Sequence, residues 1–139
     1  MVTQKNRDRR FIEQTVQLAK DNEHELSTKL CAIIAIRNKW ISTGFNSKKS
    51  HPFQATFAKN EEAIYIHAET SSIHKSLREI PEEDLRRATL YVGRVKGKDN
   101  SRWGLAKPCE GCFRAIKHYG IKRIVFTLDG NGEFEELIL

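Results

Sequence analysis

Two short motifs, far apart in the sequence, place the strongest constraint on how this chain folds. The first is His67-x-Glu69, and the second is Pro108-Cys109-x-x-Cys112. One imidazole and two thiolates are ligands that suit zinc, and three protein ligands leave a fourth tetrahedral position for water. We therefore expect the fold to bring His67, Cys109 and Cys112 together around one zinc ion per chain.

Both motifs are predicted to lie at the start of a helix. His67 and Glu69 would point about 200° apart in the middle of a helix, so they can serve one site only from its first turn. Cys109 and Cys112 share a helix face, and Pro108 directly before them suits a helix start. The positive ends of two helix dipoles would then favour the thiolate form of both cysteines.

Glu69 is not needed as a zinc ligand, and its position suits it to carry protons for the water at the metal. The complete pattern matches the signature of the zinc deaminases of cytosine and adenine. On these residues the chain resembles the cytidine and deoxycytidylate deaminase superfamily. The resemblance implies hydrolytic deamination of a cytosine-containing nucleoside or nucleotide, with Glu69 as the catalytic residue and release of ammonia.

The order of the expected elements predicts an α/β fold with a mixed sheet between helical layers. We expect helices at 7–22, 67–79 and 109–119, a short helical turn at 81–85, strands at 30–36, 40–45, 89–95, 123–128 and 133–139, and loops at 46–60 and 96–107. The connection at 129–132 is too short for a parallel crossover, so the last strand should run antiparallel to its neighbour. The prediction is a single domain at 1–139 with a three-layer α-β-α, cytidine deaminase-like fold, a five-stranded mixed sheet and an antiparallel C-terminal hairpin.

Composition narrows the class of protein. A hydrophobic content of 39% and a charged content of 30% are typical of a soluble globular protein. The longest apolar run, at 30–36, is too short to span a membrane, and the first residues contain no apolar signal segment, so we expect a cytoplasmic protein without a membrane partner. The net charge of +6 can attract phosphate, in a nucleotide or in a polynucleotide. Cys31, inside the apolar run, is expected to be a buried core thiol.

Candidate substrate contacts follow from the resemblance. It implies that Asn46 binds the sugar or positions the base, that the N–H of Ala68 contacts the base carbonyl, and that carbonyl groups near Pro108 contact the amino group. Asn46 can equally be a turn residue that ends a strand. Nucleoside deaminases of this type have a glutamate where this chain has Lys48, and a lysine there suits a phosphate. Trp103 can stack on a base or anchor its loop in the core.

Several alternatives remain open at this stage. An antiparallel last strand resembles the free-nucleoside deaminases and favours a small substrate, while the positive charge leaves single-stranded DNA or RNA, deaminated at cytosine or adenine, as an alternative. Guanine or a pterin is a further possible substrate. A zinc-stabilised binding module without catalysis would need a fourth ligand, such as His51 or His74, and a lone C-x-x-C can be redox-active. The resemblance also implies a homo-oligomer.

Overall fold

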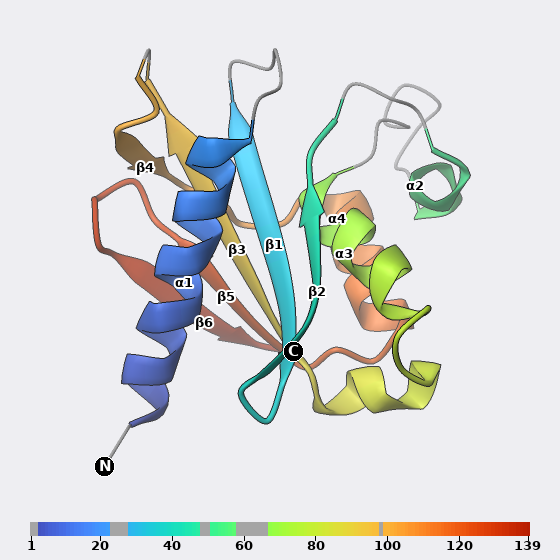
Figure 1. Ribbon diagram of the computed structural model, residues 1–139. Coiled ribbons are helices and arrows are strands. Elements are labelled where there is room, and N and C mark those ends of the chain that lie inside the picture. The colour runs from blue at the N-terminus through green and yellow to red at the C-terminus, as the bar shows by residue number, and fades with distance from the viewer. Residues whose placement is uncertain (1–2, 23–27, 48–50, 58–66, 98) are drawn as a thin grey trace.

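The protein is a three-layer α-β-α structure, as expected from the order of its elements. Figure 1 shows the computed structural model, which describes residues 3–22, 28–47, 51–57, 67–97 and 99–139. The elements are α1 (Gln4–Asp21), β1 (Lys29–Ile36), β2 (Lys39–Phe45), α2 (Pro52–Phe57), α3 (Ala68–Ser76), the 3-10 helix η1 (Glu82–Arg87), β3 (Thr89–Lys96), β4 (Arg102–Gly104), α4 (Glu110–His118), β5 (Arg123–Thr127) and β6 (Phe134–Ile138). Helix α1 covers one face of the sheet, and α3 and α4 cover the other.

The sheet is mixed, and its main path has the strand order β2-β1-β3-β5-β6. Strand β1 is antiparallel to both β2 and β3, and β3 is parallel to β5. The chain returns from β5 to β6 through a tight turn, and these two strands are antiparallel. The five-stranded path and the antiparallel C-terminal hairpin are therefore both confirmed.

A sixth, short strand was missed by the sequence analysis. β4 lies in the segment predicted to be a loop, and it pairs with β3 from Arg94 to Lys96. Strand β5 pairs only with the first half of β3, so the second half would present unpaired backbone groups at that edge. β4 supplies the partners, and Thr127 joins the two segments by donating from its hydroxyl to the Gly104 carbonyl at 2.6 Å.

The apolar run in β1 is buried on both faces, as a central strand should be. Ala32 and Ile34 pack in the core under α3 and α4, whereas Cys31 and Ile33 pack in the core under α1. This alternation follows from the two-residue period of a strand. The Cys31 side chain is fully buried, which confirms the expected core thiol. Within the described residues no helix is long and apolar enough to cross a membrane.

The segment after β2 also differs from its prediction as a polar loop. Residues 52–57 form the short helix α2, which contacts both α3 and α4. Pro52 occupies the first helical position, where its missing N–H costs nothing. The residues on either side, 48–50 and 58–66, lie outside the described part of the chain. The predicted phosphate contact Lys48 is among them.

Candidate metal centre and its cavity

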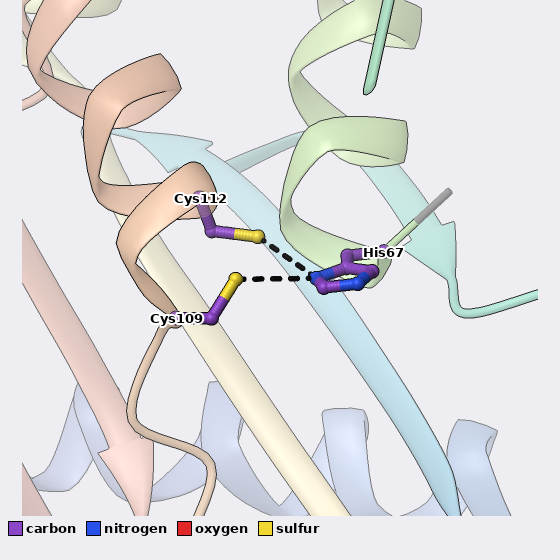
Figure 2. A group of neighbouring side chains, drawn as sticks. All are labelled: His67, Cys109 and Cys112. Carbon is purple, nitrogen blue, oxygen red and sulfur yellow. Dashed lines mark hydrogen bonds between the residues drawn. The ribbon is translucent and has the colours of Figure 1, made fainter. Parts of the chain in front are cut away.

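The three predicted ligands meet where the first turns of α3 and α4 face each other. His67 is the N-cap residue of α3, and Cys109 is the N-cap residue of α4. Figure 2 shows their side chains pointing toward one another, with Cys112 reaching the same point from one turn further along α4. The Nδ1 atom of His67 lies 3.2 Å from Sγ of Cys112 and 3.5 Å from Sγ of Cys109.

These distances fit a zinc ion. Bond lengths of about 2.3 Å to sulfur and about 2.0 to 2.1 Å to nitrogen, at tetrahedral angles, would place each Sγ roughly 3.6 Å from the ligand nitrogen. All three ligand atoms lie within 4.8 Å of one another. The part of the chain that the structure describes offers no fourth histidine, cysteine or carboxylate to this group. His67, Cys109 and Cys112 can therefore hold zinc as an open, three-ligand site.

The two thiols of this site differ in their affinity for protons. A hydrogen bond from the Cys112 thiol, together with one to His67, lowers the pKa of Cys109 to about 3. The same hydrogen bond to Cys109, with burial, raises the pKa of Cys112. Bonding to Cys109 also raises the pKa of His67. One thiolate is thus already favoured in the metal-free protein, and a bound cation would replace the remaining protons.

Glu69 lies in the first turn of α3, beside the three ligands. Its side chain is buried, with 4% of its surface exposed. Burial raises the pKa of the Glu69 carboxyl above its ordinary value, and the nearby charge of His67 only partly opposes this effect. A raised pKa brings proton exchange by this carboxyl closer to neutral pH, which is the property a proton carrier needs.

Gln54 from α2 holds this helix start in place, and the sequence analysis did not identify it. Its side chain is 1% exposed, and its Oε1 accepts a hydrogen bond from the backbone N–H of His67 at 3.2 Å. The same oxygen accepts a hydrogen bond from the hydroxyl of Thr70. A buried amide in a segment that looked like a loop gave no periodic signal, so only the tertiary contact reveals its role.

Gly44 allows α3 to approach the sheet closely at this point. A Cβ atom at this position would lie 2.4 Å from both the Ala68 carbonyl oxygen and the Ser72 nitrogen. No side chain fits between β2 and the first turn of α3. The position of the metal ligand in that turn therefore depends on the absence of a side chain at Gly44, one residue before the end of β2.

The metal centre opens onto a cavity of about 330 Å³. Ala68, Glu69 and Cys109 line it on the metal side, and Asn46 lines it from the end of β2. The Asn46 side chain accepts from the Leu30 N–H and donates to the Thr28 carbonyl, both at 3.0 Å. Asn46 thus lies at the cavity, as predicted for a substrate contact, but it also ties β2 to the start of β1.

Two cationic residues line the same cavity and were not identified from the sequence. Lys107 precedes the cysteine motif, and Arg94 lies in β3 on the face covered by α3 and α4. The Arg94 guanidinium donates from NH1 to the Leu105 carbonyl at 3.3 Å, while its Nε is buried without a hydrogen-bond partner. Because a buried donor without a partner is costly, Arg94 is suited to meet an anionic ligand.

One other predicted substrate contact lies away from this cavity. Trp103 packs in the core under α1, on the opposite face of the sheet, and is 9% exposed. This position agrees with the alternative in which Trp103 anchors its loop in the core. Pro108 is buried, and the residues on either side of it, Lys107 and Cys109, both line the cavity. His51 and His74 contact each other, with ring centroids 4.9 Å apart, and neither joins the metal-binding group.

The comparison with family models now identifies the class of protein. Residues 5–128 match the model of the cytidine and deoxycytidylate deaminase zinc-binding region. The match covers most of the chain and includes His67, Glu69, Cys109 and Cys112. This chain belongs to that family, and zinc is the cofactor that the family and the three-ligand group share. A search of curated protein sequences finds no significant match.

Solved structures with the same fold include deaminases. The dCMP deaminase of cyanophage S-TIM5 in apo form aligns with 94% of this chain and 88% of its own, at 17% identity and a TM-score of 0.55. The cytidine deaminase of Burkholderia pseudomallei aligns with 93% of this chain and 91% of its own, at 13% identity and a TM-score of 0.61. Form 2 of RibD from Acinetobacter baumannii aligns with 94% of this chain but 32% of its own, at 19% identity and a TM-score of 0.54. At these identities the likeness establishes the fold.

Proposed function

We propose that this chain is a zinc-dependent hydrolytic deaminase that converts the cytosine of a nucleoside monophosphate to uracil and releases ammonia. The observation that carries the proposal is the buried carboxyl of Glu69 beside the three zinc ligands, at the wall of a cavity large enough for a small ligand. Membership of the deaminase family supports the reaction type. The cations that line the cavity support the choice of a phosphorylated substrate.

The chain's own residues account for the proton transfers in this reaction. When bound by His67, Cys109 and Cys112, zinc supplies Lewis acidity that lowers the pKa of water. Glu69 accepts a proton as the water oxygen bonds to C4 of the base, and it passes that proton to N3. As the bond from C4 to the amino nitrogen breaks, Glu69 carries the second water proton to the leaving group, which departs as ammonia.

Orientation of the base falls to the residues around Glu69. In this proposal the Ala68 N–H contacts the base carbonyl, and Ala68 lines the cavity next to the proton carrier. The Oδ1 of Asn46 keeps one lone pair free beyond its bond to Leu30, so it can accept from a sugar hydroxyl. A carbonyl near Pro108 accepts from the amino group. These three roles follow the pattern of the family.

Arg94 is the group we assign to the phosphate. A guanidinium matches the geometry of a phosphate with two parallel hydrogen bonds, and the buried Nε of Arg94 has a free donor for one of them. Lys107 adds a second positive charge at the cavity. Lys48, outside the described residues, would add a third if it borders the cavity, as the sequence suggested.

The test is ammonia release by the zinc-loaded protein against cytidine, deoxycytidine and their monophosphates, with adenosine, guanine, a pterin and single-stranded oligonucleotides as alternatives. We expect turnover of a monophosphate well above that of its nucleoside. Arg94→Gln should raise the KM for the monophosphate about tenfold and leave that for the nucleoside nearly unchanged. Arg102→Gln, an exposed change in the same hairpin, is the matched control. Equal KM values for nucleoside and monophosphate in the wild type would overturn the phosphate assignment.

Deamination within single-stranded DNA or RNA is the second candidate, and the net charge of +6 favours it. Binding of a polynucleotide should weaken steeply with salt because counterions are released, whereas a monophosphate makes few such contacts. Turnover restricted to oligonucleotides, with a steep salt dependence, would replace the first proposal with this one. A binding module without catalysis predicts no turnover of any substrate.

We extend the proposal to the setting of the enzyme. It includes one zinc per chain, a single domain over 1–139 and a cytoplasmic location. The one metal-binding group found among the described residues supports the first, and the three free cysteines suit a reducing compartment. A homo-oligomer remains part of the proposal. The partly buried aromatic group formed by Phe53, Phe57 and Tyr119 offers a surface for it. Size-exclusion chromatography with light scattering would measure the oligomeric state.

A further inference from the structure

A second cavity, of about 380 Å³, is lined by arginines from three separate elements. Arg7 comes from the first turns of α1, Arg37 from the turn between β1 and β2, and Arg87 from the end of η1. We call it the arginine cavity. Tyr91 and Thr89 of β3 also line it, and no carboxylate, imidazole or thiol is among its lining residues.

The arginine cavity lies far from the metal centre. Ala35 and Tyr91, which line it, face α1, whereas the deaminase cavity lies on the face covered by α3 and α4. Along β1 and β3, the residues that line the two cavities are three to five positions apart, or roughly 10 to 17 Å. Figure 1 shows the same separation: the β1–β2 turn and the start of α1 lie at the end of the sheet opposite the first turns of α3 and α4.

The positive charge of this cavity is not balanced within the described residues. Arg7 and Arg37 form no ion pair with another described residue, and the Nε of Arg7 is buried without a hydrogen-bond partner. Arg87 pairs with Asp84 at 2.9 Å, but its side chain is 51% exposed. A cluster of guanidinium groups with so few counterions is stabilised by an anion from solution.

The nearest buried carboxylate, Asp8, is already committed to other partners. Its oxygens accept hydrogen bonds from the Tyr91 hydroxyl at 2.8 Å, from the Gln4 amide at 3.0 Å and from the guanidinium of Arg123. The first turn of α1 contains no acidic residue, so the positive end of the helix dipole adds to the potential of the arginines.

The backbone at Arg37 supports a role in binding. Arg37 and Asn38 are the two residues of the hairpin turn, with φ of 50° and 66°. Such turns prefer glycine, asparagine or aspartate, and a long side chain in the left-handed region costs free energy. The strained turn directs an arginine to the cavity, where glycine would relieve the strain but remove the charge.

We propose that the arginine cavity is a second binding site, and that it takes the phosphate group of a nucleotide or of a polynucleotide backbone. Guanidinium groups from three elements can surround the phosphate oxygens from different sides, and each can donate two hydrogen bonds. The Nε of Arg7 gains the acceptor that it lacks, and the Asn38 amide can donate to the same anion. The site is separate from the deaminase cavity and does not depend on the proposed reaction.

The test is isothermal titration of the zinc-loaded protein with inorganic pyrophosphate at low salt. Arg7→Gln and Arg37→Gly should each weaken binding about tenfold or more, because each removes charge-assisted hydrogen bonds to the anion. Arg37→Gly should leave the melting temperature unchanged or raise it, since glycine suits the turn. Arg10→Gln, an exposed change of the same charge on α1, is the matched control and should leave binding within twofold.

Arg94→Gln separates this site from the deaminase cavity. Pyrophosphate binding that survives Arg94→Gln and is lost in Arg7→Gln and Arg37→Gly supports the proposal. Binding lost only in Arg94→Gln, binding unchanged in both cavity variants, or no binding at all would overturn it. A short oligothymidylate then distinguishes the two sources of phosphate: tighter binding than pyrophosphate with a steep salt dependence indicates a polynucleotide, and a shallow dependence indicates a free nucleotide.

Discussion

The deaminase cavity and the arginine cavity are lined differently, although each contains an arginine whose Nε is buried without a hydrogen-bond partner. In the deaminase cavity, Arg94 shares the walls with a buried carboxyl and a thiol of the metal centre. The arginine cavity is lined mainly by polar residues, and no carboxylate, imidazole or thiol is among them. The same type of side chain therefore lies in two different surroundings. One is suited to chemistry on a bound anion, and the other is suited to binding alone.

The difference arises from how the two helical layers meet the sheet. α3 and α4 direct their first turns at one point, so two helix starts converge on the metal ligands. α1 crosses the other face alone, and its first turn meets a hairpin turn rather than another helix start. Converging helix starts can hold a cation between thiolates, whereas a single helix start surrounded by arginines favours an anion.

The largest effect is expected for Cys109→Ala, compared with Cys31→Ala. Removing one of three ligands should lower zinc affinity at least about a hundredfold and abolish turnover. Cys31 is also a cysteine, but it is fully buried under α1 and burial raises its pKa to about 12, so its replacement should leave zinc bound. Metal analysis after dialysis measures both variants. Stoichiometric zinc in Cys109→Ala would show that the ligand set is wrong.

Glu69→Gln should have the next largest effect. The glutamine keeps the shape of the side chain but cannot carry a proton, so kcat should fall by about 10² to 10⁴ while zinc stays bound. Arg7→Gln in the other cavity should change kcat less than twofold. Ammonia release and metal content are measured on the same samples. A Glu69→Gln protein with wild-type kcat would rule out the assigned proton carrier.

Alanine substitutions at two glycines, one facing each helical layer, should have effects of intermediate size. A Cβ atom at Gly44 would meet α3, and one at Gly93 would lie 2.1 Å from the Thr15 hydroxyl oxygen of α1. Alanine at either position should lower the free energy of unfolding by about 1–3 kcal/mol, because a packed helix must shift.

Only Gly44→Ala should also impair the metal centre. The helix it displaces carries His67 at its N-cap and Glu69 in its first turn, so zinc affinity and kcat should each fall about tenfold or more. Gly93→Ala should keep both within twofold, measured on protein that is folded at the assay temperature. Equal losses of zinc affinity in the two variants would mean that the two faces are not independent.

The comparison of sequence and structure separates local signals from tertiary ones. The ligands His67, Cys109 and Cys112 could be predicted because their spacing and flanking residues restrict them to two helix starts. The order of the main strands followed from apolar runs and a connection too short for a crossover. Such signals lie within a few neighbouring residues, so the sequence alone reveals them.

The remaining features depend on contacts between distant segments. Arg94 and Gln54 gave no signal, since an arginine in a strand and a glutamine two residues after a proline are ordinary residues until the fold buries the Nε of one and the amide of the other. The sequence left two roles possible for Trp103, base stacking and core packing. Only the pairing of β4 with β3 places it under α1. The arginine cavity likewise combines residues as far apart in the sequence as Gln4 and Tyr91.

The smallest effect on the metal centre and on turnover is expected at Asp8 beside the arginine cavity, where a substitution should change stability alone. Burial alone would raise the pKa of Asp8, but hydrogen bonds from Arg123, Tyr91 and Gln4 hold it below its ordinary value. Asp8→Asn removes the charge and should lower the free energy of unfolding by about 2 kcal/mol at neutral pH. Zinc content and kcat should stay within twofold of the wild type, because Asp8 belongs to α1, on the face of the sheet opposite the metal centre.

The lowered pKa of Asp8 also determines how the stability difference between wild type and Asp8→Asn changes with pH. Since the folded-state pKa of Asp8 is lowered, its charge stabilises the protein above the ordinary aspartate pKa of about 3.9, and that stability is lost as pH falls through the lowered value. The difference in unfolding free energy between wild type and Asp8→Asn should therefore be constant from about pH 7 to pH 5 and narrow at lower pH. Urea unfolding at a series of pH values measures it. Glu13→Gln, an exposed change on the same helix, should show little difference at any pH. A difference in unfolding free energy that grows as the pH falls would mean that the Asp8 carboxylate does not stabilise the folded protein.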